Sequence, residues 1–132
     1  METTTVSFWV PGGRGAASAA RHSVLSTGAA LSPAASGDLA LLVSELVTNA
    51  IQHGGADPTR RIEVRLSTAE RRVRVEVSDP GANGVPSTDR VTAEGGWGLV
   101  LVDKLSEAWG RERTPAGGSL AWFEMSLVDR AA

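Results

Sequence analysis

The chain has 132 residues, a formal net charge of -2 and no cysteine. At this length we expect one domain built around a single core. The small net charge gives no electrostatic argument for binding nucleic acid or a membrane, and the absence of cysteine excludes disulfides and thiolate metal sites. The N-terminus lacks the features of a signal peptide and no run approaches a membrane-spanning length, so we expect a cytoplasmic protein.

The N-terminal part of the chain predicts a strand and then a helix. Ser7 to Val10 is typical of a short strand, which Pro11 to Gly13 ends. The Ala-rich run from Ala16 to about Leu31 indicates a helix, with Val24 and Leu25 as its core anchors.

A second helix is predicted from Ser36 to His53. Cap-type residues and a first-turn acid begin it at Ser36 to Asp38, after Pro33 has ended the first helix, and Gly54 marks its C-terminal end. Its apolar residues follow helical spacing, at Leu39, Leu42, Val43, Leu46 and Ala50.

The middle of the chain predicts a β-hairpin followed by a long loop. Arg61 to Ser67 and Arg72 to Ser78 both alternate apolar and polar residues, and the short link between them makes the pair antiparallel. Asp79 to Gly96 shows little periodicity. A loop of this length inside a small domain is usually functional or mobile.

The C-terminal part predicts a helix over Gly98 to Leu105 and a hairpin of Trp109 to Arg113 with Ser119 to Val128. The whole pattern predicts an α+β fold, a two-layer sandwich of one mixed, mostly antiparallel sheet with its helices on one face. Trp9, Trp109 and Trp122 are most simply explained as core or sheet-face packing, and an exposed Trp9 or Trp122 would indicate a partner surface.

Glu45 and Asn49 are four residues apart on the second predicted helix, so their side chains project from one face of it. They lie at the edge of its apolar stripe, where a carboxylate and an amide are unfavourable unless they have partners or a function. Taken alone, the pair is more simply explained as a solvated Glu and Asn at the rim of a core helix.

Two further segments combine glycine with a position suited to a ligand. Asp79 ends an apolar strand and is followed by a turn-forming run through Gly84, and Gly95 to Gly98 open a helix. A strand-terminal carboxylate can accept a ligand's hydrogen bond, and free amides at a helix start suit phosphate. An ordinary turn and a flexible helix entry are the simpler explanations of each segment alone.

Taken in order, these features resemble the N, G1, G2 and G3 boxes of the GHKL ATPases. The boxes correspond to Glu45 and Asn49, to Asp79 and Gly81, to Gly96, Gly98 and Leu99, and to Gly118 and Ser119. The run from Ser44 to Gly54 resembles the anti-sigma factor serine kinase branch. The boxes span about residues 38–127 of a single 1–132 domain, and the family implies a Bergerat-type ATP-binding fold.

The resemblance implies ATP and Mg²⁺ as cofactors. By analogy, Asn49 would coordinate the Mg²⁺, Glu45 would act as general base toward the incoming hydroxyl, and Asp79 would hold the adenine amino group. The amides of Gly96 and Gly98 would bind the phosphates.

The remaining box residues are implied to shape the rest of the pocket. Gly81 and Gly84 would form its floor, Gly118 and Ser119 would close its adenine end, and Val85 to Gly95 would be a lid over ATP.

The implied function is a protein serine/threonine kinase that transfers the γ-phosphoryl group of Mg·ATP to a small antagonist protein and thereby controls a sigma factor. The implied partners are the sigma factor, the antagonist and a second copy of the chain, with no direct nucleic-acid or membrane contact. The alternative is a nucleotide- or partner-binding regulatory module without turnover. Two departures from the family favour this alternative: Gly84 follows Gly81 at three positions where many members have two, and Trp97 stands where close relatives often have Arg.

Overall fold

The computed structural model describes residues 3–26, 33–54, 61–69, 71–79, 96–115 and 118–126. In chain order the elements are β1 (Thr3–Pro11), α1 (Ala16–Leu25), α2 (Pro33–Gly54), β2 (Arg61–Ala69), β3 (Arg72–Asp79), α3 (Gly96–Leu105), β4 (Ala108–Arg113) and β5 (Ser119–Ser126).

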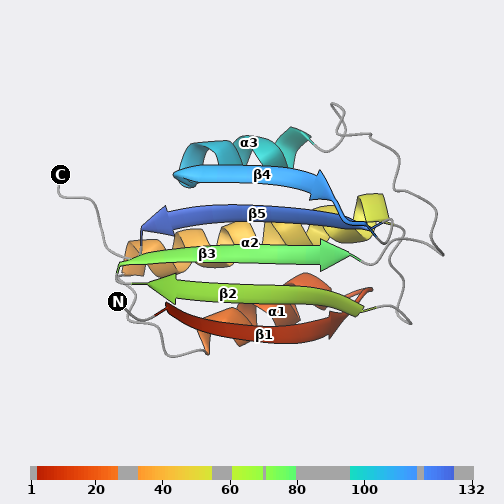
Figure 1. Ribbon diagram of the computed structural model, residues 1–132, viewed down its shortest axis with the longest axis horizontal. Coiled ribbons are helices and arrows are strands. Elements are labelled where there is room, and N and C mark those ends of the chain that lie inside the picture. The colour runs from red at the N-terminus through yellow and green to blue at the C-terminus, as the bar shows by residue number, and fades with distance from the viewer. Residues whose placement is uncertain are drawn as a thin grey trace.

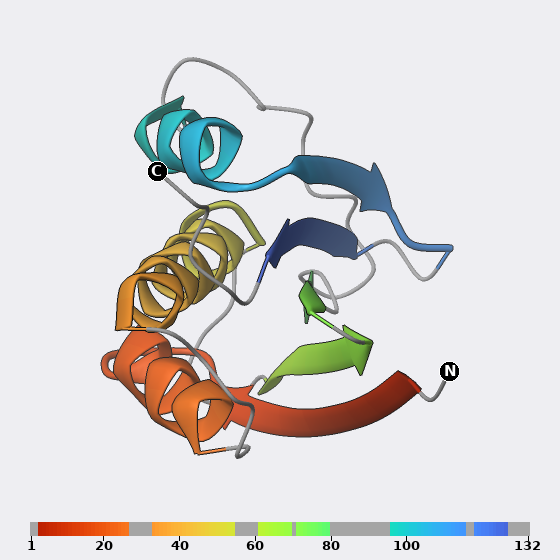
Figure 2. The same cartoon turned by 90° about the vertical axis from the view of Figure 1, so that its left-hand side faces the viewer.

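The five strands form one sheet in the order β1-β2-β3-β5-β4 (Figure 1). All pairings between these strands are antiparallel, so the described sheet is antiparallel rather than mixed. The three helices lie together on one side of it (Figure 2). The predicted two-layer α+β fold with helices on one face is therefore confirmed.

The core lies between the sheet and the helices. In β2 and β3 every second residue faces it, as the alternation of apolar and polar residues predicts. Phe123 of β5, which pairs with Val75, is fully buried in the same layer. The buried residues of the central strands are Ile62, Val64, Leu66, Val73, Val75, Val77, Phe123 and Met125.

Helix α2 is the central helix and begins earlier than predicted. Its first residue is Pro33, three residues before Ser36. Proline has no amide hydrogen, but the amides of a first helical turn have no partner within the helix in any case. Its fixed φ also suits a helix start. The predicted apolar stripe is buried at Leu39, Leu42, Val43 and Leu46, with Ala50 packed against the core.

Helix α1 is shorter than predicted and uses different anchors. It ends at Leu25, where the Ser26 hydroxyl donates to the carbonyl of His22 (2.7 Å), and residues 27–32 lie outside the described part of the chain. Val24 is buried as predicted, but Leu25 is 42% exposed, so its assignment to the core is wrong. The buried face consists of Ala16, Ala20 and Val24, spaced four residues apart.

The run Pro33–Ile51 is long and apolar enough to cross a membrane by length and composition alone, with a mean hydropathy of 1.2. The expectation that no run approaches membrane-spanning length is therefore wrong by this criterion. In this structure the apolar stripe of the run is the core face of α2, packed against the sheet. A soluble protein's core helix meets the same criterion.

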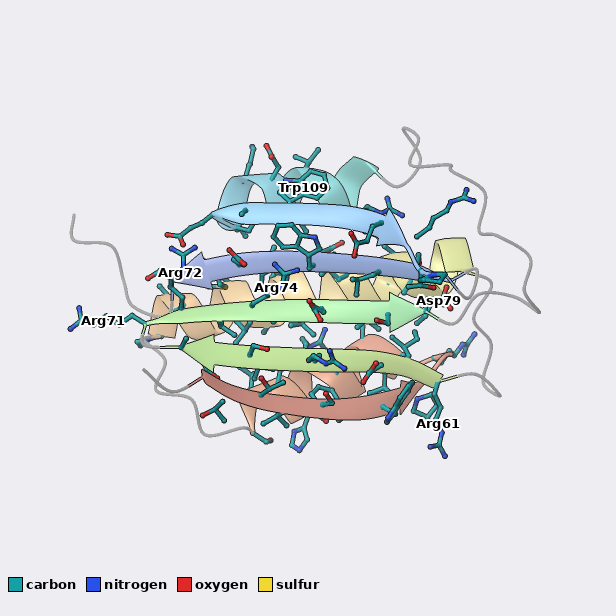
Figure 3. All side chains as sticks on the ribbon, viewed as in Figure 1. Arg61, Arg71, Arg72, Arg74, Asp79 and Trp109 are labelled. Atoms are coloured by element: carbon teal, nitrogen blue, oxygen red, sulfur yellow. The ribbon has the colours of Figure 1, made fainter. Side chains whose placement is uncertain are left out.

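The face of the sheet opposite the helices carries a network of ion pairs (Figure 3). Arg74 donates to Glu76 and Glu124, both at 3.0 Å, and its guanidinium carbon lies 4.1 Å from the centre of the Trp122 ring. Burial opposes the charge of Arg74, but the hydrogen bonds to the two carboxylates raise its pKa above the ordinary value. Trp9 on β1 is 55% exposed, the condition under which the sequence indicated a partner surface.

Candidate nucleotide-binding site

The ends of three elements meet at one end of the sheet. Strand β3 ends there at Asp79, α2 ends there, and α3 begins there, on the right in Figure 1. Asp79 pairs with Ser119 of β5, and Ser119 pairs with Arg113 of β4. The fold thus brings the predicted N, G2 and G3 positions, and the start of G1, to the same end of the molecule.

Asn49 lies in the C-terminal half of α2 and is only 8% exposed. None of the described residues forms a hydrogen bond with its Nδ2 atom. A buried amide without a partner costs free energy, and its two ends can be exchanged by rotation, so the side chain can offer either a donor or an acceptor. This orphaned polar atom fits a polar ligand next to α2.

Glu45 lies one helical turn before Asn49 and is half-buried. Within the described part of the chain it takes part in no hydrogen bond or ion pair. Its neighbour Ser44 is occupied instead: Ser44 Oγ accepts from Arg21 of α1 (3.0 Å) and donates to the carbonyl of Ala40 (2.8 Å). The carboxylate of Glu45 is therefore left available for a ligand or a substrate.

Asp79 is 2% exposed and continues the buried alternation of Val73, Val75 and Val77. Its carboxylate consequently faces the layer between the sheet and α2, which is also the layer of Asn49. Figure 3 shows Asp79 at the end of β3 beside the last turns of α2.

Gly118 and Ser119 begin β5 beside Asp79. The amide of Gly118 donates to Thr114 Oγ1 (3.0 Å), and the amide of Thr114 donates to the Gly118 carbonyl (3.1 Å), which closes the β4–β5 turn. Gly118 is buried and Ser119 is half-buried. These two residues lie beside Asp79 at the edge of the candidate site, and their role at an adenine end stays a prediction.

Helix α3 begins at Gly96, two residues earlier than the predicted Gly98. Both glycines and Leu99 therefore fall in its first turn, whose amides have no partner within the helix. Such amides, at the positive end of the helix dipole, suit a phosphate. Gly81, Gly84 and the lid proposed for Val85 to Gly95 lie outside the described residues.

A metal ion at this site would need ligands other than a cluster of protein side chains. In the part of the chain that the structure describes, no group of three or more His, Cys, Asp or Glu side chains could hold one. Mg²⁺ commonly takes only one or two protein ligands and completes its shell with water and phosphate oxygens. The single amide of Asn49 is compatible with that form of binding. It is not enough to hold a metal ion with protein ligands alone.

Sequence reasoning missed Arg111, a half-buried residue of β4. Burial alone lowers the pKa of its guanidinium. The signal was present in the predicted strand Trp109 to Arg113, because strand alternation places Arg111 on the same side as Trp109.

Comparison with known proteins identifies the family. The model of the histidine kinase-like ATPase domain matches residues 14–122. No curated protein matches the chain.

Two solved structures resemble the chain. The histidine kinase domain of the blue-light activated histidine kinase from Erythrobacter litoralis EL346 is 26% identical, with a TM-score of 0.50 over 70% of this chain and 45% of that one. This chain thus spans less than half of that kinase domain structure. The SiaB-SiaC complex from Pseudomonas aeruginosa has a TM-score of 0.56 over 91% of this chain and 88% of the matched chain, at 15% identity, which supports the fold. With its fold, its ordered boxes and a family match over most of its length, this chain belongs to the histidine kinase-like ATPase domain family, the GHKL ATPases.

Proposed function

We propose that this chain is an ATP-dependent protein serine/threonine kinase of the anti-sigma factor type, acting in the cytoplasm. The observation that carries the proposal is the buried amide of Asn49. Its Nδ2 atom lacks a partner, and it lies one turn from the available carboxylate of Glu45. A helix that keeps an unsatisfied amide and a carboxylate side by side at a core boundary loses stability, which a ligand-binding role explains.

Each described residue of the site has a role in this proposal. Asn49 would hold Mg²⁺, Asp79 would accept a hydrogen bond from the adenine amino group, and the first-turn amides of α3 would bind the phosphates. When bound, Mg·ATP supplies the γ-phosphoryl group and the metal charge that neutralises it. Glu45 would accept the proton of the substrate hydroxyl. The rest of the protein would position the nucleotide and the substrate and exclude water.

The proposed substrate is a serine or threonine of a small antagonist protein, whose modification would control a sigma factor. One structure that resembles this chain comes from a complex of two proteins, SiaB and SiaC. A protein of similar fold is thus found in a complex with a second protein, which supports a protein partner for this chain. The proposal includes a homodimer through the sheet, where Trp9 is exposed; light scattering after gel filtration would test it.

A regulatory module that binds nucleotide or partner without turnover is the second candidate. Trp97 and the spacing from Gly81 to Gly84 favour it, because both alter positions that would contact the phosphates or the pocket floor. The available Glu45 favours the kinase.

Two substitutions on α2 distinguish the candidates. The assay is transfer of radiolabelled γ-phosphate to a small antagonist domain, the proposed substrate. Glu45→Gln should keep ATP binding and lose transfer, by roughly a hundredfold to ten-thousandfold for a general base, whereas Asn49→Ala should also lose the Mg²⁺-dependent part of binding. Glu112→Gln, an exposed residue of β4, is the matched control.

The outcomes distinguish the kinase from the binding module and test the role of Glu45. A wild type that binds ATP and the antagonist but transfers nothing is the binding module. Transfer at the wild-type rate by Glu45→Gln would leave a kinase but remove Glu45 as its base.

A further inference from the structure

Arg111 lies on the helix-facing side of β4. It follows Trp109 by two residues, and Trp109 packs against the core and donates from Nε1 to Asp103 of α3 (2.9 Å). Its cross-strand neighbour, Ala121, also packs against the core. Arg111 therefore points into the layer that contains the nucleotide site, away from the ion-pair network on the open face.

Among the residues that the structure describes, none supplies a counter-charge to the guanidinium of Arg111. Within the described residues it forms no ion pair and no hydrogen bond. Arg72 and Arg74 on the opposite face each pair with two carboxylates. For Arg111, burial is the only influence on the pKa and lowers it, whereas carboxylates raise that of Arg74. A half-buried cation without a partner is unfavourable unless an anion arrives to meet it.

Strand and helix geometry place Arg111 beside the first turn of α3. Strand β4 and α3 run in opposite directions, and Trp109 meets α3 at Asp103 (Figures 1 and 3). Two residues of strand advance the chain by about 6.8 Å, which equals about 4.5 residues of helix. Arg111 is therefore level with Gly98 and Leu99, where the α3 amides have no helical partner.

We propose that Arg111 binds the phosphoryl oxygens of the nucleotide, as part of the site formed by the α3 amides and Asn49. Guanidinium groups bind phosphate in a planar, two-bonded geometry that suits such a role. Without an anion, the cation and the positive end of the α3 dipole repel each other, and a phosphate compensates both. This inference rests on the proposed nucleotide site and names the side chain that supplies charge where Trp97 replaces the Arg common in relatives.

The test compares wild type with Arg111→Met, using inorganic tripolyphosphate, citrate, adenosine and Mg·ATP as ligands. Arg71→Met is the matched control, because Arg71 is exposed at the far end of the sheet from Asp79 (Figure 3). Without ligand, Arg111→Met should resist urea at least as well as wild type, because it removes an unpaired charge. Tripolyphosphate should raise the melting temperature of wild type and Arg71→Met, but not of Arg111→Met.

Binding measurements complete the test. Mg·ATP should bind Arg111→Met about ten- to a hundredfold more weakly than wild type, the range expected for a lost charge-assisted hydrogen bond, and adenosine should bind both alike. Equal protection of wild type and Arg111→Met by tripolyphosphate would overturn the inference. So would protection of wild type by citrate but not by tripolyphosphate, which would assign Arg111 to a carboxylate.

The same data separate this inference from the proposed function. If wild type binds tripolyphosphate through Arg111 but binds neither adenosine nor ATP, the kinase proposal fails and the phosphate site stands. If wild type binds adenosine and ATP while Arg111→Met binds both as tightly, the phosphate role of Arg111 fails alone.

Discussion

Gly110→Ala should destabilise the protein through a single steric contact on the open face of the sheet. Gly110 of β4 pairs with Trp122 of β5, and the indole lies over the glycine. A Cβ at position 110 would lie 2.7 Å from Nε1 of Trp122 and 2.8 Å from Cε2 and Cζ2. Carbon atoms do not approach this closely, so the ring must move, and its contact with Arg74 moves with it.

The expected magnitude follows from three contributions. Overpacking costs roughly 1–3 kcal/mol, and losing an exposed cation–π contact costs about 0.5–1 kcal/mol. Alanine also lowers the conformational entropy of the unfolded chain, which stabilises the folded protein by about 0.4–1 kcal/mol. Because the half-buried ring can swing outward, we expect a net loss of about 1–2 kcal/mol, which lowers the urea midpoint by roughly 0.5–1 M.

The assay is urea unfolding followed by circular dichroism, which does not depend on the moved tryptophan. Gly37→Ala is the matched control: the new Cβ would meet nothing within 4 Å, and alanine favours a helix interior, so α2 should gain roughly 0.5–1 kcal/mol. In a Trp122→Ala background, Gly110→Ala should no longer destabilise. An equal loss in both backgrounds would refute the steric argument.

Three further changes test the fold and the site. Gly15→Ala should lower the melting temperature, since φ is +83° there and a left-handed residue other than glycine costs roughly 1–2 kcal/mol. Val24→Ala should cost roughly 2 kcal/mol and Leu25→Ala much less, because only Val24 is buried; equal losses in urea unfolding would return Leu25 to the core. Asp79→Asn should weaken adenine nucleotides more than guanine nucleotides in calorimetry, and equal weakening would argue against an adenine contact.

The fold was predictable where periodicity was strong. The stripe of α2 and the alternation of β2 and β3 bury apolar residues as the sequence indicates. Helix α1 was harder, because alanine carries most of its buried face and Leu25 attracts attention as the larger residue. The start of α2 was misplaced because Pro33 was interpreted as a break, although proline is also well suited to a first turn.

The sequence indicated which residues form the candidate site but not the contacts that they make. The order of the boxes indicated Asn49, Asp79 and Ser119, and the sheet register explains why residues so far apart in sequence lie at one end. Nothing in the sequence showed that the Asn49 amide would be buried with an unpartnered nitrogen. Arg111 was missed because a charged residue in a strand is usually solvent-facing, and the packing of Trp109 against the core is what fixes the face that Arg111 occupies.

Asn49 and Asp79 are proposed to lie in a site that binds Mg·ATP. Isothermal calorimetry on the folded protein, with and without Mg²⁺, tests it most directly, alongside Asn49→Ala. Wild type should bind ATP saturably and more tightly when Mg²⁺ is present, and Asn49→Ala should lose this dependence on Mg²⁺. No heat from the folded wild type with millimolar Mg·ATP would contradict it.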